Sequence, residues 1–234
     1  MKPIKLTHLF WQHFRCALVA LAMITVTATA SAQAPKLVID GTGTPHQVVE
    51  SVTEQLVVFF SSNKNRLNED PEGYYADVRQ LLEPVIAFPY IARNVMARYW
   101  GYATAEQRKM FVDVFTDNLV ETYVKGMASY SKFDMSVVQP EKEITGTDKA
   151  NVVQLVIDST GETKVVYNMR RKDAESNWQL VNLWLGSSNL GKSLQSQFDG
   201  AVTSNLPKLS KGDKYNKDQV NSAIDAAIQN WGKA

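Results

Sequence analysis

The sequence predicts an α+β domain in which helices come first and antiparallel strands follow. Apolar residues recur at three- and four-residue steps over residues 44–130, as they do on amphipathic helices. Over residues 133–185 they alternate with polar neighbours, as on strands. Helical spacing returns after residue 190. We therefore expect N-terminal helices and a C-terminal helical tail packed on a curled antiparallel sheet of about four strands.

Residues 1–32 have the form of a secretory signal peptide. A basic start that ends at Arg15 precedes the apolar run CALVALAMITVTATA, and the triplet ASA at 30–32 fits the small-x-small cleavage pattern. The apolar run is too short for a membrane span, and no stop-transfer signal follows it. We expect cleavage near Ala32–Gln33, a flexible N-terminal arm over residues 33–43, and a single α+β domain over residues 44–234.

The helical half of that domain, residues 44–130, opens with a capping box formed by Thr44 and Gln47 around a first-turn proline. A second helix restarts at Asp70-Pro71. Pro84 must end or bend it, because proline has no N–H and clashes with the preceding turn.

The longest helix starts at a capping box of Thr104 and Gln107 and runs to about Tyr130. About 26 residues at 1.5 Å each give a rod of roughly 39 Å. Its apolar band is wide and rich in methionine and aromatic residues, so it needs a large partner surface. We expect the downstream strands to supply that surface.

The second half, residues 131–234, begins with four strands, near residues 133–137, 151–158, 163–172 and 178–185. The short links DSTGE and DAESN make the last three an antiparallel meander. In the third strand, Val165, Tyr167 and Met169 share one face, and Arg170 lies on the other. A helix through Phe198 and a terminal helix capped by Asp218 follow.

Loss of the leader would change the chemistry that the chain can perform. It removes the single cysteine and two of the three histidines, leaving His46, which we expect to be solvent-exposed at the start of the first helix. A thiol nucleophile, a clustered histidine metal site and a Ser-His-Asp triad are therefore disfavoured. The remaining 202 residues hold 22 basic and 24 acidic side chains, a balance without the basic footprint of a nucleic-acid-binding protein.

Two groups leave alternatives open. Glu83 lies in the apolar segment LLEPVIAF, and the sequence allows two interpretations of it. It is either a helix-end carboxylate in solvent or a buried acid whose pKa is raised and which could transfer protons. The cluster Arg170-Arg171-Lys172 reads as a solvated strand end or as a contact for an anion. No GxSxG, GxGxxG or phosphate-binding loop is present. We expect no enzymatic activity.

The chain resembles the MlaC family, also called the toluene-tolerance auxiliary-component family, of Gram-negative bacteria. The segments that carry the resemblance are LLEPVIAFPYIARNVMARYWGYATAEQRKMFVDVFTDNLVETYV and VVYNMRRKDAESNWQLVNLWLGSSNLGKSLQSQF, in that order between a leader and a helical tail. One departure is the polar Gly186-Ser187-Ser188 before the following helix. The resemblance covers nearly all of the chain after the leader.

This resemblance implies an NTF2-like cone that carries phospholipid through the periplasm and maintains outer-membrane lipid asymmetry. The partners implied are an outer-membrane lipoprotein–porin complex and the MCE-type subunit of an inner-membrane ABC transporter. The family uses no cofactor, and phospholipid is its cargo. The competing readings are a small-molecule enzyme on the same cone that uses Glu83, and a lipid-free adaptor between envelope proteins.

From face and position in the sequence, we expect ten residues to contact the lipid. Nine would line an apolar cavity between helices and sheet, and the tenth, Arg170, would lie at its mouth near the headgroup. The cavity residues are Val85, Met96, Tyr99, Phe111, Phe115, Met127, Val165, Tyr167 and Met169.

Overall fold

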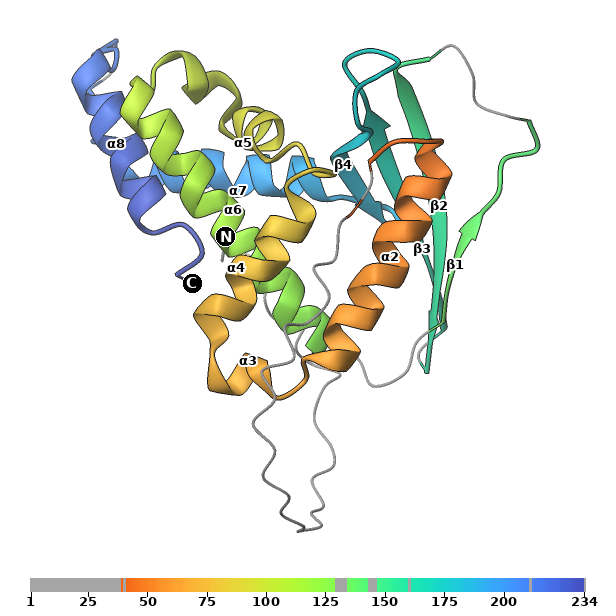
Figure 1. Ribbon diagram of the computed structural model, residues 1–234. Coiled ribbons are helices and arrows are strands. Elements are labelled where there is room, and N and C mark those ends of the chain that lie inside the picture. The colour runs from red at the N-terminus through yellow and green to blue at the C-terminus, as the bar shows by residue number, and fades with distance from the viewer. Residues whose placement is uncertain are drawn as a thin grey trace. The chain divides into compact units, whose positions relative to one another are not determined.

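Helices, strands and a final pair of helices follow one another in the order that the sequence predicts (Figure 1). The computed structural model describes residues 39, 41–128, 134–142, 147–159, 161–210 and 212–233. These residues all belong to one unit, Leu37–Ala234. The predicted leader lies outside the described residues. The helices are α2 (Pro45–Ser62), α3 (Arg66–Glu69), α4 (Pro71–Leu82), α5 (Phe88–Met96), the 3₁₀ turn η1 (Ala97–Gly101), α6 (Ala105–Ala128), α7 (Leu190–Asn205) and α8 (Lys217–Gln229).

The helices begin where short polar side chains cap them. The Thr44 hydroxyl accepts from the Gln47 N–H (3.2 Å), and the Gln47 side chain accepts from the Thr44 N–H (2.9 Å), so the predicted capping box is confirmed. Thr104 and Gln107 repeat it with the same two distances at the start of α6. Helix α4 ends at Leu82, two residues before Pro84, as predicted.

The five strands pair antiparallel in sequence order, so the sheet is a simple meander. They are β1 (Asp134–Val138), β2 (Lys149–Asp158), β3 (Gly161–Arg170), β4 (Gln179–Leu185) and β5 (Ser188–Asn189). The prediction of about four strands missed β5. Only two residues long, β5 has no alternating pattern, and it forms because Gly186, at φ +57°, lets the chain turn back onto β4.

The two faces of this sheet have different neighbours. Val152 and Met169 are buried in the same core as Val48 of α2, and we call their side of the sheet the inner face. The opposite side, which carries Val153 and Val166 by alternation, is the outer face. Figure 1 shows α2 along one face of the strands and no described helix over the other.

Helix α6 joins two hydrophobic cores. Its C-terminal half contributes Val120 and Val124 to the core on the inner face of the sheet. Its N-terminal half contributes Phe111 and Phe115 to a second core, built with α5, α7 and α8, which we call the helical core. Our expectation that the strands alone would cover the long helix was therefore wrong. The C-terminal segment folds back and covers this half of the helix, because Phe198 and Trp231 pack against Phe111, and Trp231 also packs against Phe115.

Two details at the ends of the domain also differ from the sequence expectations. Asn216, not Asp218, caps α8, because its side chain accepts from the Gln219 N–H (2.8 Å), while Asp218 lies within the first turn. The last residues of the predicted flexible arm contact Trp178. Its N–H donates to the Gly41 carbonyl (2.9 Å), and its indole N–H donates to that of Gly43 (3.2 Å).

Candidate functional site

The candidate site lies where the inner face of the sheet meets the C-terminal half of α6, around two tyrosines. Tyr123 extends from α6 and Tyr167 from β3, the strand at the centre of the sheet. Burial raises the pKa of Tyr167 to about 12. Burial also raises the pKa of Tyr123, and the neighbouring Tyr167 phenol adds to that rise. Both rings pack against the buried core on the inner face of the sheet and stay half-buried themselves.

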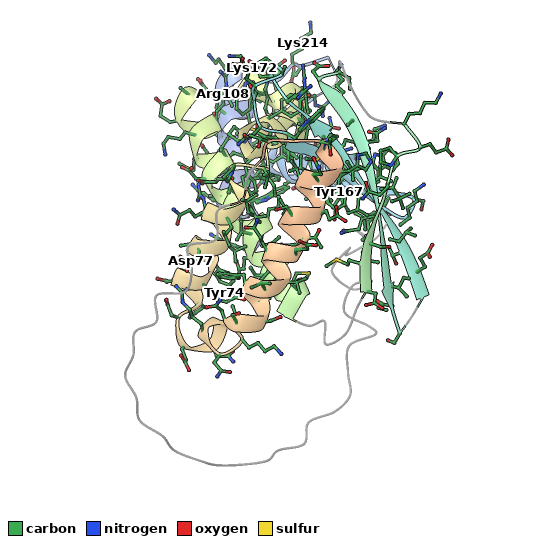
Figure 2. All side chains as sticks on the ribbon, turned by 45° about the vertical axis from the view of Figure 1, so that its right-hand side comes forward. Tyr74, Asp77, Arg108, Tyr167, Lys172 and Lys214 are labelled. Carbon is green, nitrogen blue, oxygen red and sulfur yellow. The ribbon has the colours of Figure 1, made fainter. Side chains whose placement is uncertain are left out.

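A polar relay fixes Tyr167 and ties α2 to the sheet. The Tyr167 hydroxyl donates to Gln154 Oε1 (2.7 Å), and Gln154 Nε2 donates to the Thr53 hydroxyl on α2 (3.0 Å). Thr53 in turn donates to the Val49 carbonyl (2.8 Å). In Figure 2, Tyr167 is labelled beside α2 on the side of the strands. Since Gln154 is buried, this relay satisfies an amide that would otherwise cost stability.

Several apolar side chains around this relay are only partly covered, although Val124 and Val152 in the core beneath them have 0% exposure. In the helical core, Phe111, Phe115 and Phe198 have 0% exposure. Near the tyrosines, large apolar residues of α6 and the inner face stay half-buried; they are Leu119, Tyr123, Met127, Val137, Tyr167 and Leu183. A close-packed interior would seal such residues. This region therefore offers apolar surface that another apolar molecule could cover.

The structure divides the ten predicted lipid contacts into separate groups. Val165, Tyr167 and Met169 share the inner face, and Val85 lies beside β4, where its carbonyl accepts from the Leu180 N–H (2.8 Å). Met127 is half-buried in the last turn of α6.

The other five predicted contacts lie elsewhere. Met96, Tyr99, Phe111 and Phe115 belong to the helical core. Arg170 is exposed on the outer face, opposite Lys149. The structure thus places the remaining five of the ten on or beside the inner face of the sheet and the last turn of α6.

Sequence reasoning missed Tyr123 and Gln154 as members of this site. Tyr123 falls four residues before Met127 and shares its helix face, so the helical period could have found it. Gln154 interrupts the apolar strand VVQLV, and a single amide in such a run is a signal of an internal hydrogen bond.

The structure supports the reading of Glu83 as a helix-end carboxylate in solvent and overturns the prediction for His46. The Glu83 side chain is 54% exposed and accepts from Arg79 Nε (3.0 Å), so it is not the buried acid of the enzyme reading. His46 was predicted to be exposed, and this was wrong: it is only 5% exposed. The segment around Ile39 and Gly41–Gly43 packs at the start of α2, and burial lowers the pKa of His46.

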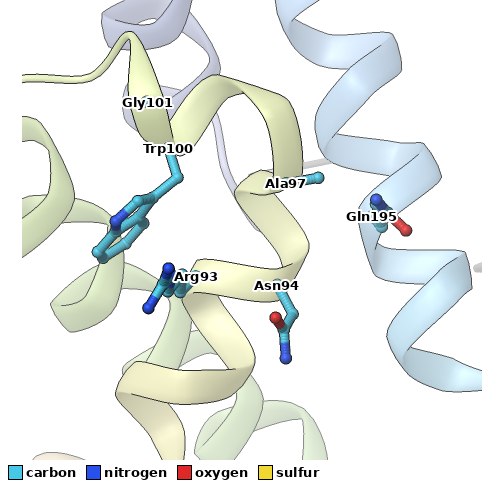
Figure 3. A pocket seen from close by; sticks show the side chains of 6 residues that line it. All are labelled: Arg93, Asn94, Ala97, Trp100, Gly101 and Gln195. Carbon is cyan, nitrogen blue, oxygen red and sulfur yellow. The ribbon is translucent and has the colours of Figure 1, made fainter.

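Two surface hollows lie away from the tyrosines, between the α5–η1 turn and α7. The larger, of about 590 Å³, is lined by Arg93, Asn94, Ala97, Trp100, Gly101 and Gln195 (Figure 3). The second, of about 400 Å³, shares Ala97 and Gln195 and includes Met96 and Tyr99. Figure 3 shows Gln195 across from Ala97, with Arg93 and Trp100 on the other side of the turn. The lining of each hollow is a mixture of polar and apolar groups, and neither is the continuous apolar wall that acyl chains need.

The described part of the chain lacks two features. Within it, no three His, Cys, Asp or Glu side chains gather as metal ligands would. None of its helices combines the length and apolar character that crossing a bilayer requires.

Comparison with known proteins gives consistent matches. The family model described as "MlaC protein" matches residues 50–211. The toluene tolerance protein ttg2D of Pseudomonas putida is 28% identical over 170 residues, which are 72% of this chain and 77% of that protein. The intermembrane phospholipid transport system binding protein MlaC of Haemophilus influenzae is 21% identical over 165 residues, 70% of this chain and 72% of that protein.

A solved structure has the same fold. It is the phospholipid-binding protein from Ralstonia solanacearum in complex with a phospholipid, with a TM-score of 0.63 at 15% sequence identity. The match covers 80% of this chain and 98% of that one. The α+β architecture with an open antiparallel sheet is thereby confirmed.

Proposed function

This chain belongs to the MlaC family, and from that premise we propose that it is a periplasmic phospholipid carrier. It would move phospholipid between the outer and inner membranes and so maintain the lipid asymmetry of the outer membrane. Its partners would be an outer-membrane lipoprotein–porin complex and the MCE-type subunit of an inner-membrane ABC transporter. The leader would direct it to the periplasm and be cleaved near Ala32–Gln33.

The names of two similar proteins support this proposal. The Haemophilus influenzae relative is named for intermembrane phospholipid transport, and the Ralstonia solanacearum protein with the same fold was solved with a phospholipid bound. The first name describes phospholipid transport and binding, the second describes phospholipid binding, and neither names a reaction. We accordingly propose that this chain has phospholipid as cargo and needs no cofactor.

The free energy of exposing acyl chains to water explains why a lipid carrier needs an apolar cavity rather than catalytic groups. Two acyl chains carry roughly 30 methylenes, and exposing each to water costs about 0.8 kcal/mol, about 20–25 kcal/mol in total. An apolar cavity removes that cost during transit. Because cavity and bilayer are similarly apolar, the two end states differ little in free energy, and the membrane partners must set the direction.

The half-buried apolar surface around Tyr123 and Tyr167 is the single observation in this molecule that favours a lipid site. We propose that acyl chains enter between α6 and the inner face and cover that surface. Met127, Met169 and Val165 would contact the chains, because unbranched methionine side chains adapt to acyl chains of different length. The tyrosine hydroxyls suit a cavity edge, where the ring is apolar and its tip can meet water or a headgroup.

Native mass spectrometry of the purified mature protein tests the function. We expect a mass increment equal to one or more phospholipids, which organic extraction removes and phospholipid vesicles restore. A protein that purifies without lipid and takes up none from vesicles would instead be the lipid-free adaptor.

Two methionine substitutions on α6 test the position of the site. Met127→Trp puts a larger side chain beside the inner face, whereas Met110→Trp makes the same change at an exposed position of the same helix. We expect Met127→Trp to lower bound lipid several-fold and Met110→Trp to leave it unchanged. Equal lipid content in both variants would contradict this site while leaving the carrier function intact.

A further inference from the structure

The outer face of the sheet has opposite charges at its two ends. At one end Lys149 and Arg170 are direct cross-strand partners. At the other end Asp134 and Glu162 flank Ile157, each paired with it in register. Among the described residues, none forms an ion pair with any of these four charged side chains. Like charges placed directly opposite each other destabilise a sheet, so the Lys149–Arg170 pair suits an anionic group from outside.

Between these ends, the centre of the outer face is an apolar row. The register aligns Val138, Val153, Val166 and Trp184 in this row across four strands. The next row on one side holds Asn151, Asn168 and Asn182, whose side chains hydrogen-bond to one another, and the next row on the other side holds Ser136, Leu155 and Lys164. Val138 is 44% exposed and Ile157 46% exposed, while the other apolar residues are half-buried. No described helix lies over this face (Figure 1). A contiguous apolar patch with a charged border is typical of an interaction surface.

We propose that this face binds a second copy of the same chain, face to face, around a two-fold axis that lies in the interface and crosses the strands at the row of Val166. Such an axis reverses the strand direction in the second copy. Arg170 of each copy then lies over Glu162 of the other. Lys149 lies over Ile157 of the other copy, between its Asp134 and Glu162. The apolar rows meet at the centre, where sheets pack about 10 Å apart.

The charge pattern decides between this arrangement and its alternatives. An axis parallel to the strands would place Arg170 over Arg170 and Glu162 over Glu162, which is repulsive. An anionic lipid surface would attract Lys164 and the Lys149–Arg170 end but repel Asp134 and Glu162. A partner that is itself negative at one end and positive at the other matches the charges at both ends of the face, and the chain is such a partner.

The size of the face sets the expected affinity. Strands β2 and β3 have ten residues each, so the face is about 33 Å long and, across four strands, about 15 Å wide. The resulting planar area of about 500 Å² per copy is at the small end of specific interfaces. We therefore expect reversible dimers with a dissociation constant in the micromolar range, roughly 10–100 μM.

Sedimentation equilibrium of the mature chain from about 1 to 300 μM, bracketing that range, tests the proposal. We expect a monomer–dimer equilibrium in the wild type. Arg170→Glu and Glu162→Arg should each weaken dimerisation about tenfold or more, because each places like charges together. The double variant, which exchanges the two charges, should recover the wild-type constant to within about threefold. Both positions are exposed, so we expect the variants to fold, and circular dichroism checks this.

One control variant and three possible results test whether the outer face forms this dimer. Lys208→Glu makes a comparable charge reversal in the exposed loop between α7 and α8, and it should leave dimerisation unchanged. A wild type that stays monomeric throughout the range overturns the proposal, as does a double variant that fails to recover. Binding of monomers to vesicles of anionic phospholipid that Arg170→Glu abolishes would assign the face to a lipid surface instead.

Discussion

At the scale of single residues, His46 is the group whose environment most directly links the fold to pH. It is buried in the first turn of α2, and burial lowers the pKa of His46 below its ordinary 6.5. Glu50, one turn further along α2, offsets part of that shift because its charge favours the imidazolium. In the unfolded chain the pKa returns toward 6.5, so below that pH the unfolded state binds more protons than the folded state.

We therefore predict that the contribution of His46 to stability is fully present above about pH 7 and decreases as the pH falls through 6.5. Chemical denaturation at pH 7.5 and pH 5.5 measures the difference. His46→Gln should reduce the difference, and Glu50→Gln should enlarge it because the offsetting charge is gone. If His46→Gln retains the full pH dependence, carboxylates elsewhere carry it and this prediction is wrong.

Ala97 is a second residue with a measurable consequence, because it has φ +46° and ψ −118° at the junction of α5 and η1. A non-glycine residue pays about 1–3 kcal/mol for such a conformation. We predict that Ala97→Gly raises the free energy of unfolding by about 1 kcal/mol, after the entropy that glycine adds to the unfolded chain. The matched control is Ala92→Gly, within α5, which should lower it by at least about 1 kcal/mol. Urea denaturation measures both, and a loss of stability in Ala97→Gly would contradict the strain.

At the scale of elements, the caps were the most predictable features and the docking of helices the least. Thr44, Thr104 and Pro84 mark helix ends by interactions within a few residues, so sequence spacing suffices to find them. The choice of partner for α6 depends on where the chain returns some 90 residues later. An apolar side chain carries no information about which apolar surface will cover it.

The candidate site was only partly predictable for the same reason. Alternation along β3 correctly placed Val165, Tyr167 and Met169 on one face and Arg170 on the other. Helical spacing found Met96 and Phe111 as inward-facing residues but could not separate the core on the sheet from the helical core. Burial of His46 depends on the segment before α2, which contacts Trp178 more than 130 residues away.

Gln107 joins a local cap to a distant helix, which makes its effect separable by experiment. Besides capping α6, its Nε2 donates to the Asn221 carbonyl (3.0 Å) and to Asp225 Oδ1 (2.8 Å) on α8. We predict that Gln107→Ala lowers the free energy of unfolding by about 2–3 kcal/mol, because it removes a cap and leaves two half-buried acceptors on α8 without this donor. Thermal or chemical denaturation measures this loss.

The control for this prediction is the equivalent position of α8. Gln219 makes the same reciprocal cap with Asn216, without a described contact to another helix. Gln219→Ala should therefore cost only about 0.5–1 kcal/mol. Equal losses for the two variants would mean that the bonds from Gln107 to α8 contribute nothing to stability.

At the scale of the whole molecule, we expect the two cores to have different roles, the helical core in stability and the inner face of the sheet in the proposed lipid binding. The helical core is sealed by Phe111, Phe115 and Phe198, so it can hold the domain together whether or not lipid is present. The inner face is bounded by the relay from Thr53 to Gln154 and Tyr167, which fixes α2 over the sheet. If lipid binds there, α2 and the C-terminal half of α6 should be the elements that respond.

This division predicts how the melting temperature depends on lipid. Delipidated protein should melt at a lower temperature than the lipid complex, because a ligand that binds only the folded state stabilises it by about 2.7 kcal/mol at one hundred times its dissociation constant. For a domain of this size that is about 5–10 °C. Binding of long-chain phospholipid should also show a negative heat-capacity change, since apolar area leaves water. Dihexanoyl phosphatidylcholine is the matched control, because it has the same headgroup with far fewer methylenes and should raise the melting temperature much less. Equal shifts from the two lipids would mean that the headgroup, and not an apolar cavity beside Tyr123 and Tyr167, carries the binding.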